Sequence, residues 1–511
     1  MSSKLLSPLQ RWLDVAPDTP VFELDGCVTR RGELLRASHV AAAYLHARGF
    51  RRGDALGLLV PDSIVWLQFL FAASRLGLLL IPISTRYKEA EIRHALDVSQ
   101  AKGIVYLRHF LKTDFSAIIE TITPGLAHLT EHLALDTVDS PFEYAEPVGA
   151  LPDPDPEALL CTFNTSGTTG RPKFAAHTQA SILRHAERVA NKLHMNTQSR
   201  TLCCLPLYGV LGFVSAMATI AAGGCCIAHP VFDAAQAATL IETQAVTHFY
   251  GSDGLLDAVL RMPNRDFSSL RWGGFAEFVG LGRRLVDFAH MQFGLHLGGV
   301  YGSSECFALM ALRDPALPAH QRALPGGTPI SEDICFRIVD TETGTVLAQG
   351  QSGELQIRGP NVMAGYLNDP EATRAAKTAD GWFHTGDLAY AADDHFVFLA
   401  RIGDSLRLRG YLVDPSEIEA VLGEHEDVEA AQVVGVRRAG RGDVAVAFVR
   451  PRNPSRESSE SELRAFCADH VANHKVPSRI IFVDSFPAVA GPNGDKIQKS
   501  RLRDLAQDLI D

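Results

Sequence analysis

The stretch between residues 60 and 83 constrains the fold of this chain more than any other. Residues 62–76 are mostly apolar, Gly77 follows, and residues 78–81 form a second apolar run that ends at Pro82. A glycine after an apolar run of this length predicts the end of a helix, and the short second run predicts a buried strand. Helices that alternate with buried strands are typical of an α/β domain with largely parallel sheets.

The same rhythm continues to about residue 300, with predicted helices over 88–98 and 239–243 and a strand over 247–250. From about residue 326, strand-like runs at 334–339, 353–358 and 395–399 lie between glycine-rich turns, which indicates a β-rich section. After residue 401 the pattern becomes α+β, with helices over 415–422 and 459–473 and strands over 430–436, 444–449 and 479–483. We therefore expect a large N-terminal α/β domain over 1–400, with a β-rich, barrel-like subdomain at about 326–400. A hinge at 401–405 would join it to a small C-terminal α+β domain over 406–511.

Composition is typical of a globular protein and excludes some classes of function. The 511 residues include 48 Lys and Arg and 59 Asp and Glu, for a formal charge of −11, with 46% hydrophobic and 21% charged residues. This acidic balance argues against a protein that mainly binds nucleic acid or anionic lipid. The most apolar stretch, residues 66–83, contains Gln68, Ser74 and Arg75 and is too polar to span a bilayer. Nine cysteines without the spacing of a zinc site or a disulfide framework predict buried thiols in a reducing cytoplasm.

The segment from Phe163 to Lys173 is the most informative about chemistry. Its sequence, Phe-Asn-Thr-Ser-Gly-Thr-Thr-Gly-Arg-Pro-Lys, holds two glycines and four hydroxyl residues in eleven positions. Glycines allow backbone amides to turn toward an anion, hydroxyls add donors, and the lysine supplies positive charge. The segment is not a P-loop, because Gly167 and Gly170 are too close and Pro172 disfavours the helix that a P-loop requires. A plain polar loop is the alternative for any such cluster, but the full string is much more specific.

This segment resembles the phosphate loop of the adenylate-forming (ANL) superfamily, which includes acyl-CoA synthetases, 4-coumarate:CoA ligases, luciferases and peptide-synthetase adenylation domains. Further blocks resemble those of the family in the same order: 301–305 (Tyr-Gly-Ser-Ser-Glu), 353–355 with 365–366, 382–387 (Trp-Phe-His-Thr-Gly-Asp), Arg401 with Gly410 and 415–419, 475–477, and 495–497. The resemblance covers roughly residues 20–505. It implies an AMP-forming acid–thiol ligase that joins a carboxylate to the α-phosphate of ATP, expels pyrophosphate and passes the acyl group to CoA.

The resemblance also implies a role for each matching residue. Lys496 would bridge the carboxylate and the α-phosphate, and Glu305 would bind Mg²⁺, which prefers carboxylate and phosphate oxygens. Asp387 would accept the ribose hydroxyls, Arg401 would add a ribose or phosphate contact, and Tyr301 would offer an aromatic face to adenine. Taken singly, they could instead be a surface lysine, a helix-terminal carboxylate, a turn aspartate, an exposed arginine and a core tyrosine. Further nucleotide contacts are expected at Thr165, Ser166, Gly167, Thr168, Thr169, Lys173, Gly302 and Ser304.

The rest of the implied site contains several departures from the family's pattern. The acyl pocket is expected at Tyr208, Gly209, Tyr250 and Gly274, the CoA side at Gly410 and Tyr411, and the pivot of a mobile C-terminal domain at Gly403. Phe174 replaces the glycine that commonly follows the phosphate-loop lysine, and Gly209, Gly403 and Asp495 replace a histidine, an aspartate or lysine, and a glycine. Phe174 would weaken ATP binding if it pointed inward. Because Lys173 must face the phosphates, its neighbour is expected to face away, into the core.

The sequence narrows the substrate without naming it. Glycines at 209, 212, 251 and 274 suggest room for a bulky acid, and the absence of the Phe-Asp pair of amino-acid adenylation domains argues against an amino acid. The leading hypothesis is a cytoplasmic acyl-CoA ligase that uses ATP, Mg²⁺ and CoA and has no redox cofactor, nucleic-acid partner or membrane span. The alternatives are an enzyme that only forms the thioester from acyl-AMP made by a partner adenylating enzyme, a ligase that acts on a carrier protein, and a non-enzymatic acyl-adenylate binding module.

Overall fold

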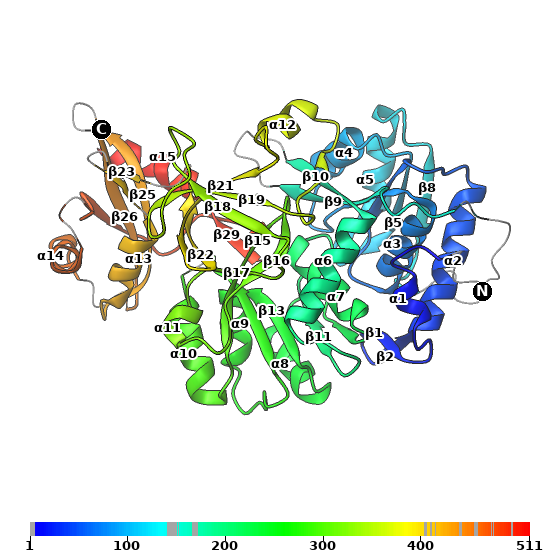
Figure 1. Ribbon diagram of the computed structural model, residues 1–511, viewed down its shortest axis with the longest axis horizontal. Helices are drawn as coiled ribbons and strands as arrows, with labels where there is room; N and C mark the ends of the chain where they lie inside the picture. Colours follow the sequence, from blue (N-terminus) through cyan, green and yellow to red (C-terminus); the bar gives the residue numbers. More distant parts are fainter. Residues whose placement is uncertain are drawn as a thin grey trace.

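The described residues form two large β-sheets, one small sheet and two two-stranded hairpins, with helices on the faces of the larger sheets (Figure 1). The computed structural model describes residues 6–139, 151, 153–165, 172–278, 280–402, 406–408, 411–413, 415–438, 442–453, 458–471, 473, 475–491 and 494–510. In this part of the chain, no helix combines the length and the hydrophobicity needed to cross a bilayer.

The first sheet contains the helix–strand unit that residues 60–83 predict. Its described strands run in the order β20-β10-β9-β4-β3-β5-β8, parallel from β9 to β8. Before β4, α3 (Ile64–Leu76) ends at Gly77, whose φ of +68° is a left-handed conformation that glycine adopts readily. The prediction is confirmed, except that the helix begins at Ile64 and Pro82 belongs to the strand. The strands are β3 (Ala55–Leu59), β4 (Leu79–Pro82), β5 (Gly103–Leu107), β8 (Glu131–Leu135), β9 (Leu159–Thr165), β10 (Lys173–Thr178) and β20 (Gly365–Tyr366).

The second sheet joins a parallel part to an antiparallel part, in the order β18-β19-β21-β22-β17-β16-β15-β14-β13-β11-β12-β1-β2. Pairing is parallel from β1 to β15 and antiparallel from β15 to β18. The β-rich section expected at about 326–400 is confirmed; among the described strands its pairing ends at β18, so it is an open extension of the sheet. The strands are β1 (Pro20–Leu24), β2 (Cys27–Arg30), β11 (Arg200–Cys203), β12 (Cys225–Ala228), β13 (His248–Ser252), β14 (Trp272–Ala276), β15 (Leu297–Ser303), β16 (Phe307–Leu312), β17 (Gly326–Pro329), β18 (Cys335–Val339), β19 (Ser352–Arg358), β21 (Phe383–Ala392) and β22 (His395–Arg401).

Helices between the two large sheets form the main hydrophobic core. The ring centroid of Trp66 on α3 lies 6.1 Å from that of Phe213 on α7 (Val210–Ala221), and Phe213 lies 5.1 Å from Phe163 on β9. On the other face of the second sheet, α8, α9 and α10 pack in a separate core that includes Phe249 of β13, whereas its neighbour Tyr250 belongs to the main core. Besides α3 and α7, the α-helices described up to residue 402 are α1 (Arg11–Asp14), α2 (Arg31–Ala47), α4 (Glu89–Val98), α5 (Phe115–Ile122), α6 (Gln179–Lys192), α8 (Ala234–Thr243), α9 (Asp253–Leu260), α10 (Gly282–Phe293), α11 (Ala319–Arg322) and α12 (Pro370–Ala375).

The C-terminal part has its own small sheet and its own core. It contains β23 (Leu406–Leu408), β24 (Tyr411–Val413), α13 (Pro415–Glu424), β25 (Val428–Arg438), β26 (Gly442–Pro451), α14 (Glu460–His470), β27 (Arg479–Phe482), a hairpin of β28 (Ala488–Gly491) and β29 (Gly494–Ile497), and α15 (Lys499–Ile510). The prediction of a helix to residue 473 is wrong. The helix ends at His470, because Val471 takes an extended backbone and packs against this core.

Candidate functional site

The hairpin of β9 and β10 carries the predicted phosphate loop. Thr165 and Lys173 lie opposite each other at its open end, so the two ends of the loop are adjacent. The loop residues themselves, including Ser166, Gly167, Thr168 and Thr169, are outside the described part of the chain. On its other edge, β10 pairs with the short strand β20 through Ala175 and Tyr366.

Phe174 turns away from the loop. Its side chain is 1% exposed and packs in the core on the outer face of the first sheet, where its ring centroid lies 6.0 Å from that of His94. The expectation that Phe174 faces the core is confirmed. The buried ring is not in the inward orientation in which Phe174 would weaken ATP binding.

The turn between β15 and β16 places Ser304 and Glu305 beside this hairpin. Ser304 Oγ donates to the carbonyl oxygen of Asn164 at 2.8 Å, and the carbonyl oxygen of Glu305 accepts from the amide of Met363 at 2.7 Å. The hydroxyl of Tyr366 donates to Oε1 of Glu305 at 3.0 Å. These hydrogen bonds connect the turn to both the β9–β10 hairpin and the segment that leads into β20.

Two buried histidines support this turn, and sequence reasoning missed them. His177 and His185 stack on Phe307 with centroid distances of 3.9 and 4.8 Å, and their Nε2 atoms lie 2.8 Å from the carbonyl oxygens of Ser304 and Ala308. Burial lowers the pKa of His177 to about 3 and that of His185 to about 4, so both imidazoles are neutral and each donates one N–H. No motif in the sequence marks these residues, because their partners lie more than a hundred positions away along the chain.

Asp387 and Arg401 meet across neighbouring strands, β21 and β22. Asp387 is 3% exposed; its Oδ1 lies 3.0 Å from Nε of Arg401, and its Oδ2 accepts from the hydroxyl of Tyr301 at 2.5 Å. The ribose contact expected at Asp387 stays a prediction. Burial and then the charge of Asp387 raise the pKa of Tyr301, which therefore stays a protonated donor.

The ring of Tyr301 has a different environment from the one expected. Only 7% of the residue is exposed, and the ring packs edge-on against Phe396 at 5.0 Å and tilted against Phe398 at 5.9 Å. In this structure its visible role is to hold Asp387, and an adenine contact stays a prediction. Gly302, which follows, has no room for a side chain, because an added Cβ would lie 2.2 Å from the carbonyl oxygen of Phe307.

The expected acyl pocket is tightly packed around its glycines. A Cβ on Gly274 would lie 2.7 Å from Cγ1 of Val300 and 3.1 Å from the ring of Tyr250. At Gly212 it would lie 2.4 Å from the carbonyl oxygen of Leu205, and at Gly251 it would lie 2.8 Å from Leu256. A side chain added at any of these three glycines would therefore meet neighbouring protein atoms, and the room for a bulky acid stays a prediction. Gly209 and Tyr208 lie directly before α7, with Gly209 as its N-terminal cap.

The predicted residues of the C-terminal part are only partly visible. Lys496 lies on β29 opposite Val489, and Tyr411 lies on β24 opposite Leu408, but the structure describes only their backbone. Gly403 and Gly410 are outside the described residues. The ammonium of Lys475, which belongs to one of the closing blocks, contacts Glu417 at 2.6 Å.

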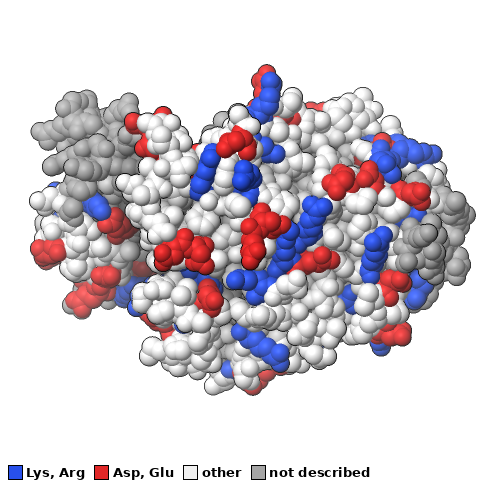
Figure 2. Space-filling model, in the orientation of Figure 1, with Lys and Arg blue, Asp and Glu red and all other residues white. Residues whose placement is uncertain are grey.

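The chemistry of Glu305 fits Mg²⁺ bound together with phosphates and water. Across the described ranges, no group of three or more His, Cys, Asp or Glu side chains is arranged to hold a metal ion by itself. Glu305 offers one carboxylate whose Oε1 is held by Tyr366, and no described residue forms a hydrogen bond to Oε2. Mg²⁺ is typically held by one or two carboxylates and substrate phosphates, which matches this arrangement. Figure 2 shows basic and acidic side chains interspersed on the face in view.

The family model for AMP-binding enzymes matches residues 9–367, and the model for the C-terminal domain of AMP-binding enzymes matches residues 417–490. The chain belongs to the AMP-binding enzyme family. The predicted membership of the ANL superfamily is confirmed, and the chain is an AMP-forming acid–thiol ligase.

This AMP-binding enzyme is similar over nearly its whole length to proteins of several organisms. It is 29% identical over 510 residues to a 4-coumarate–CoA ligase of Pinus taeda, with 94% of this chain and 91% of the relative covered. It is 32% identical over 494 residues, with 93% of each chain covered, to a Mycobacterium tuberculosis CoA ligase for a 7a-methyl-1,5-dioxo-octahydro-1H-inden-4-yl propanoyl group. Among solved structures, ATP-bound MatB of Rhodopseudomonas palustris superimposes with a TM-score of 0.88 at 24% identity and 99% coverage of both chains. That similarity confirms the predicted fold class.

Proposed function

We propose that this protein activates a carboxylic acid other than an amino acid as an acyl-adenylate and transfers the acyl group to CoA. The observation that carries the proposal is the convergence of Lys173, Tyr366 and Glu305 beside the β9–β10 hairpin. Lys173 Nζ lies 5.1 Å from the ring centroid of Tyr366, whose hydroxyl binds Glu305. A cation at the start of β10 and a carboxylate of the kind that binds Mg²⁺, both beside the β9–β10 hairpin, suit a triphosphate with its magnesium ion.

The proposed reaction has two steps. A carboxylate oxygen of the acid attacks the α-phosphorus of ATP, the bond to the β-phosphate breaks, and pyrophosphate leaves. The thiolate of CoA then attacks the acyl carbonyl, the bond to AMP breaks, and AMP leaves with the electron pair. Mg²⁺ would supply charge neutralisation on the departing phosphates. The chain's own part is to hold the nucleotide at Lys173, Glu305, Asp387 and Arg401 and to bring the ammonium of Lys496 to the carboxylate and α-phosphate.

The charges near the expected acyl pocket support an acid that carries no ammonium group. Asp253, the first residue of α9, accepts hydrogen bonds from the backbone amides of Gly254, Phe278 and Leu281 at 2.9–3.1 Å. Asp62 accepts the amide of Leu207 at 2.9 Å, and burial raises the pKa of Asp62 to about 7. Both carboxyl groups are therefore engaged by the backbone, which leaves them poorly suited to bind an α-amine.

The proposal also includes movement of the C-terminal part and a reducing location. The second sheet ends at Arg401 and the small sheet begins at Leu406, so a pivot at residues 401–405 would separate an N-terminal domain over 1–400 from a mobile domain over 406–511. All nine cysteines are free thiols, including exposed Cys27 and Cys335, which suits the cytoplasm.

Pyrophosphate release from ATP and Mg²⁺ with a panel of aromatic, medium-chain, branched and amino acids tests the proposal. We expect release with at least one acid that has no α-amine and, with CoA present, the matching acyl-CoA and AMP. The same assay started from synthetic acyl-AMP separates the two half-reactions.

Three outcomes would contradict the proposal. Thioester formation from acyl-AMP but never from acid plus ATP would establish the thioester-only alternative. Transfer to a phosphopantetheine carrier protein with no transfer to CoA would change the acceptor. Pyrophosphate release only with amino acids would overturn the substrate class.

A further inference from the structure

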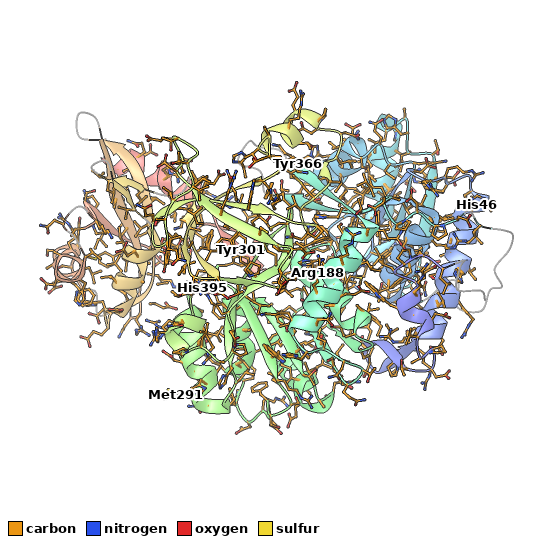
Figure 3. The ribbon with its side chains drawn as sticks, in the orientation of Figure 1. His46, Arg188, Met291, Tyr301, Tyr366 and His395 are labelled. Atoms are coloured by element: carbon orange, nitrogen blue, oxygen red, sulfur yellow. The ribbon has the colours of Figure 1, made fainter. Side chains whose placement is uncertain are left out.

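Tyr366 lies between the two charged groups of the phosphate site, and the resemblance gives it no role beyond membership of a sequence block. Its hydroxyl donates to Oε1 of Glu305 at 3.0 Å, and the ammonium of Lys173 lies over its ring, 5.1 Å from the centroid. The first contact is a hydrogen bond to a charged acceptor and the second is a cation–π interaction. One side chain thus contacts both the cation and the carboxylate. Figure 3 labels it beside α12 and β10.

The backbone around Tyr366 holds the ring in this place. β20 pairs with β10 through Ala175, directly beyond Phe174, so the register of the strands places Tyr366 next to the start of β10. The amide of Tyr366 donates to Oγ1 of Thr373 at 2.9 Å. Gly365 approaches the same threonine so closely that an added Cβ would lie 2.8 Å from its Cγ2. The pairing with β10 and the contacts with Thr373 therefore fix the backbone from which the ring extends.

The hydroxyl of Tyr366 is the donor in its contact with Glu305, because a carboxylate oxygen accepts. A protonated hydroxyl on Oε1 orients the carboxylate, and no described residue bonds to Oε2. The ring separately limits where the flexible side chain of Lys173 can lie, because the ammonium is attracted to its face.

We propose that Tyr366 is a positioning residue that presents Oε2 of Glu305 to the magnesium ion of Mg·ATP and holds the ammonium of Lys173 at the open end of the β9–β10 hairpin. The inference rests on the proposed function in that it requires Mg·ATP at this site. The two parts of the side chain have separable effects. The hydroxyl acts on the magnesium-dependent part of ATP binding, and the ring acts on the binding of ATP itself.

Calorimetric titration of the full chain with ATP, in the presence of Mg²⁺ and in the presence of EDTA, measures both effects without turnover. We expect the wild type to bind ATP more tightly with Mg²⁺. Tyr366→Phe should lose about tenfold in affinity for Mg·ATP, with little change for ATP in EDTA, since a hydrogen bond to a charged group contributes about this factor. Tyr366→Leu, which also removes the ring, should weaken ATP binding in EDTA by about two- to fivefold.

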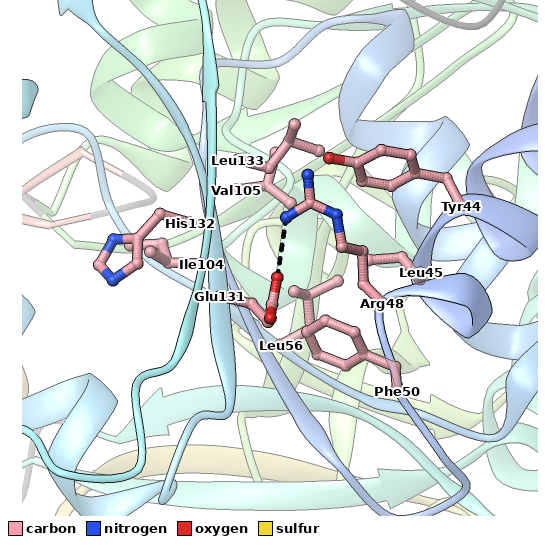
Figure 4. A pocket seen from close by; sticks show the side chains of 10 residues that line it. All are labelled: Tyr44, Leu45, Arg48, Phe50, Leu56, Ile104, Val105, Glu131, His132 and Leu133. Carbon is pink, nitrogen blue, oxygen red and sulfur yellow. Dashed lines mark hydrogen bonds and ion pairs between the residues drawn. The ribbon is translucent and has the colours of Figure 1, made fainter.

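Two further variants separate positioning from a general structural effect. In a Glu305→Gln background, Tyr366→Phe should cause little additional loss, because the carboxylate that it orients is gone. Tyr44→Phe is the matched control: that ring lines a separate small hollow between α2 and the first sheet, beside the Arg48–Glu131 ion pair (Figure 4). It should leave both affinities unchanged.

The inference is overturned if Tyr366→Phe weakens ATP equally with and without Mg²⁺, if its effect is the same in the Glu305→Gln background, or if the wild type binds ATP no better with Mg²⁺. The pyrophosphate assay tests the proposed function independently of this inference. If no acid releases pyrophosphate from the wild type but Tyr366→Phe removes the magnesium dependence, the proposed function fails and the positioning role stands.

Discussion

The hydroxyl of Tyr301 provides the sharpest test of the Asp387 site. It donates to a carboxylate that is 3% exposed and whose other described charged partner is Arg401. Tyr301→Phe removes this hydrogen bond but leaves the ring packed between Phe396 and Phe398. A hydrogen bond to a charged group contributes about 1.5–3 kcal/mol, and a buried carboxylate that loses a donor bears most of that cost. We expect the free energy of unfolding to fall by about 2 kcal/mol.

Scanning calorimetry of the variant measures this loss. In a chain of this size, about 2 kcal/mol corresponds to a fall of about 2–4 °C in the unfolding midpoint of the N-terminal part. The same substitution in an Asp387→Asn background should cost at least about 1 kcal/mol less, because the buried charge has been removed. An unchanged midpoint, or an equal loss in both backgrounds, would show that the Tyr301–Asp387 contact does not stabilise the site.

Three further predictions concern catalysis, packing and pH. Lys496→Ala should slow adenylation by about 10²–10³ and change thioester formation from supplied acyl-AMP far less; equal losses in the two rate assays would remove its assigned role. Phe174→Ala should destabilise the protein by about 3–5 kcal/mol, measured as a lower unfolding midpoint, because it empties a buried site. The KM for ATP should not improve. A lower KM would place the ring near the triphosphate. His177 and His185, with pKa values of about 3 and 4 in the fold against 6.5 unfolded, bind more protons in the unfolded chain. Stability should therefore fall as pH drops from 6.5 to 4, by up to about 1.4 kcal/mol per pH unit for each histidine. Asp62, with its pKa raised to about 7, acts in the opposite direction. The measurement is therefore the slope of the urea-derived free energy of unfolding against pH, compared between the wild type and His177→Gln. Identical slopes would contradict the assignment.

Local patterns predicted most of the elements because their causes are local. The glycine that ends α3 and the apolar run of β4 depend on neighbouring residues, and the structure places both within two residues of the prediction. The end of α14 was misjudged for the opposite reason. Val471 leaves the helix to pack against the core of the C-terminal part, and a helical pattern contains no information about that core.

The sequence by itself determined the order of the family's motif blocks, and therefore the family and the class of reaction, because those blocks are short and contiguous. Alternation along the strand predicted which side of the sheet Phe174 occupies, whereas tertiary structure alone decided what fills the space over Gly274. It also decided the partners of the two site tyrosines. Tyr301 meets Asp387 across 86 positions of the chain, and Tyr366 meets Glu305 across 61. Such contacts depend on strand register and on packing between sheets, and both are set by the whole chain at once.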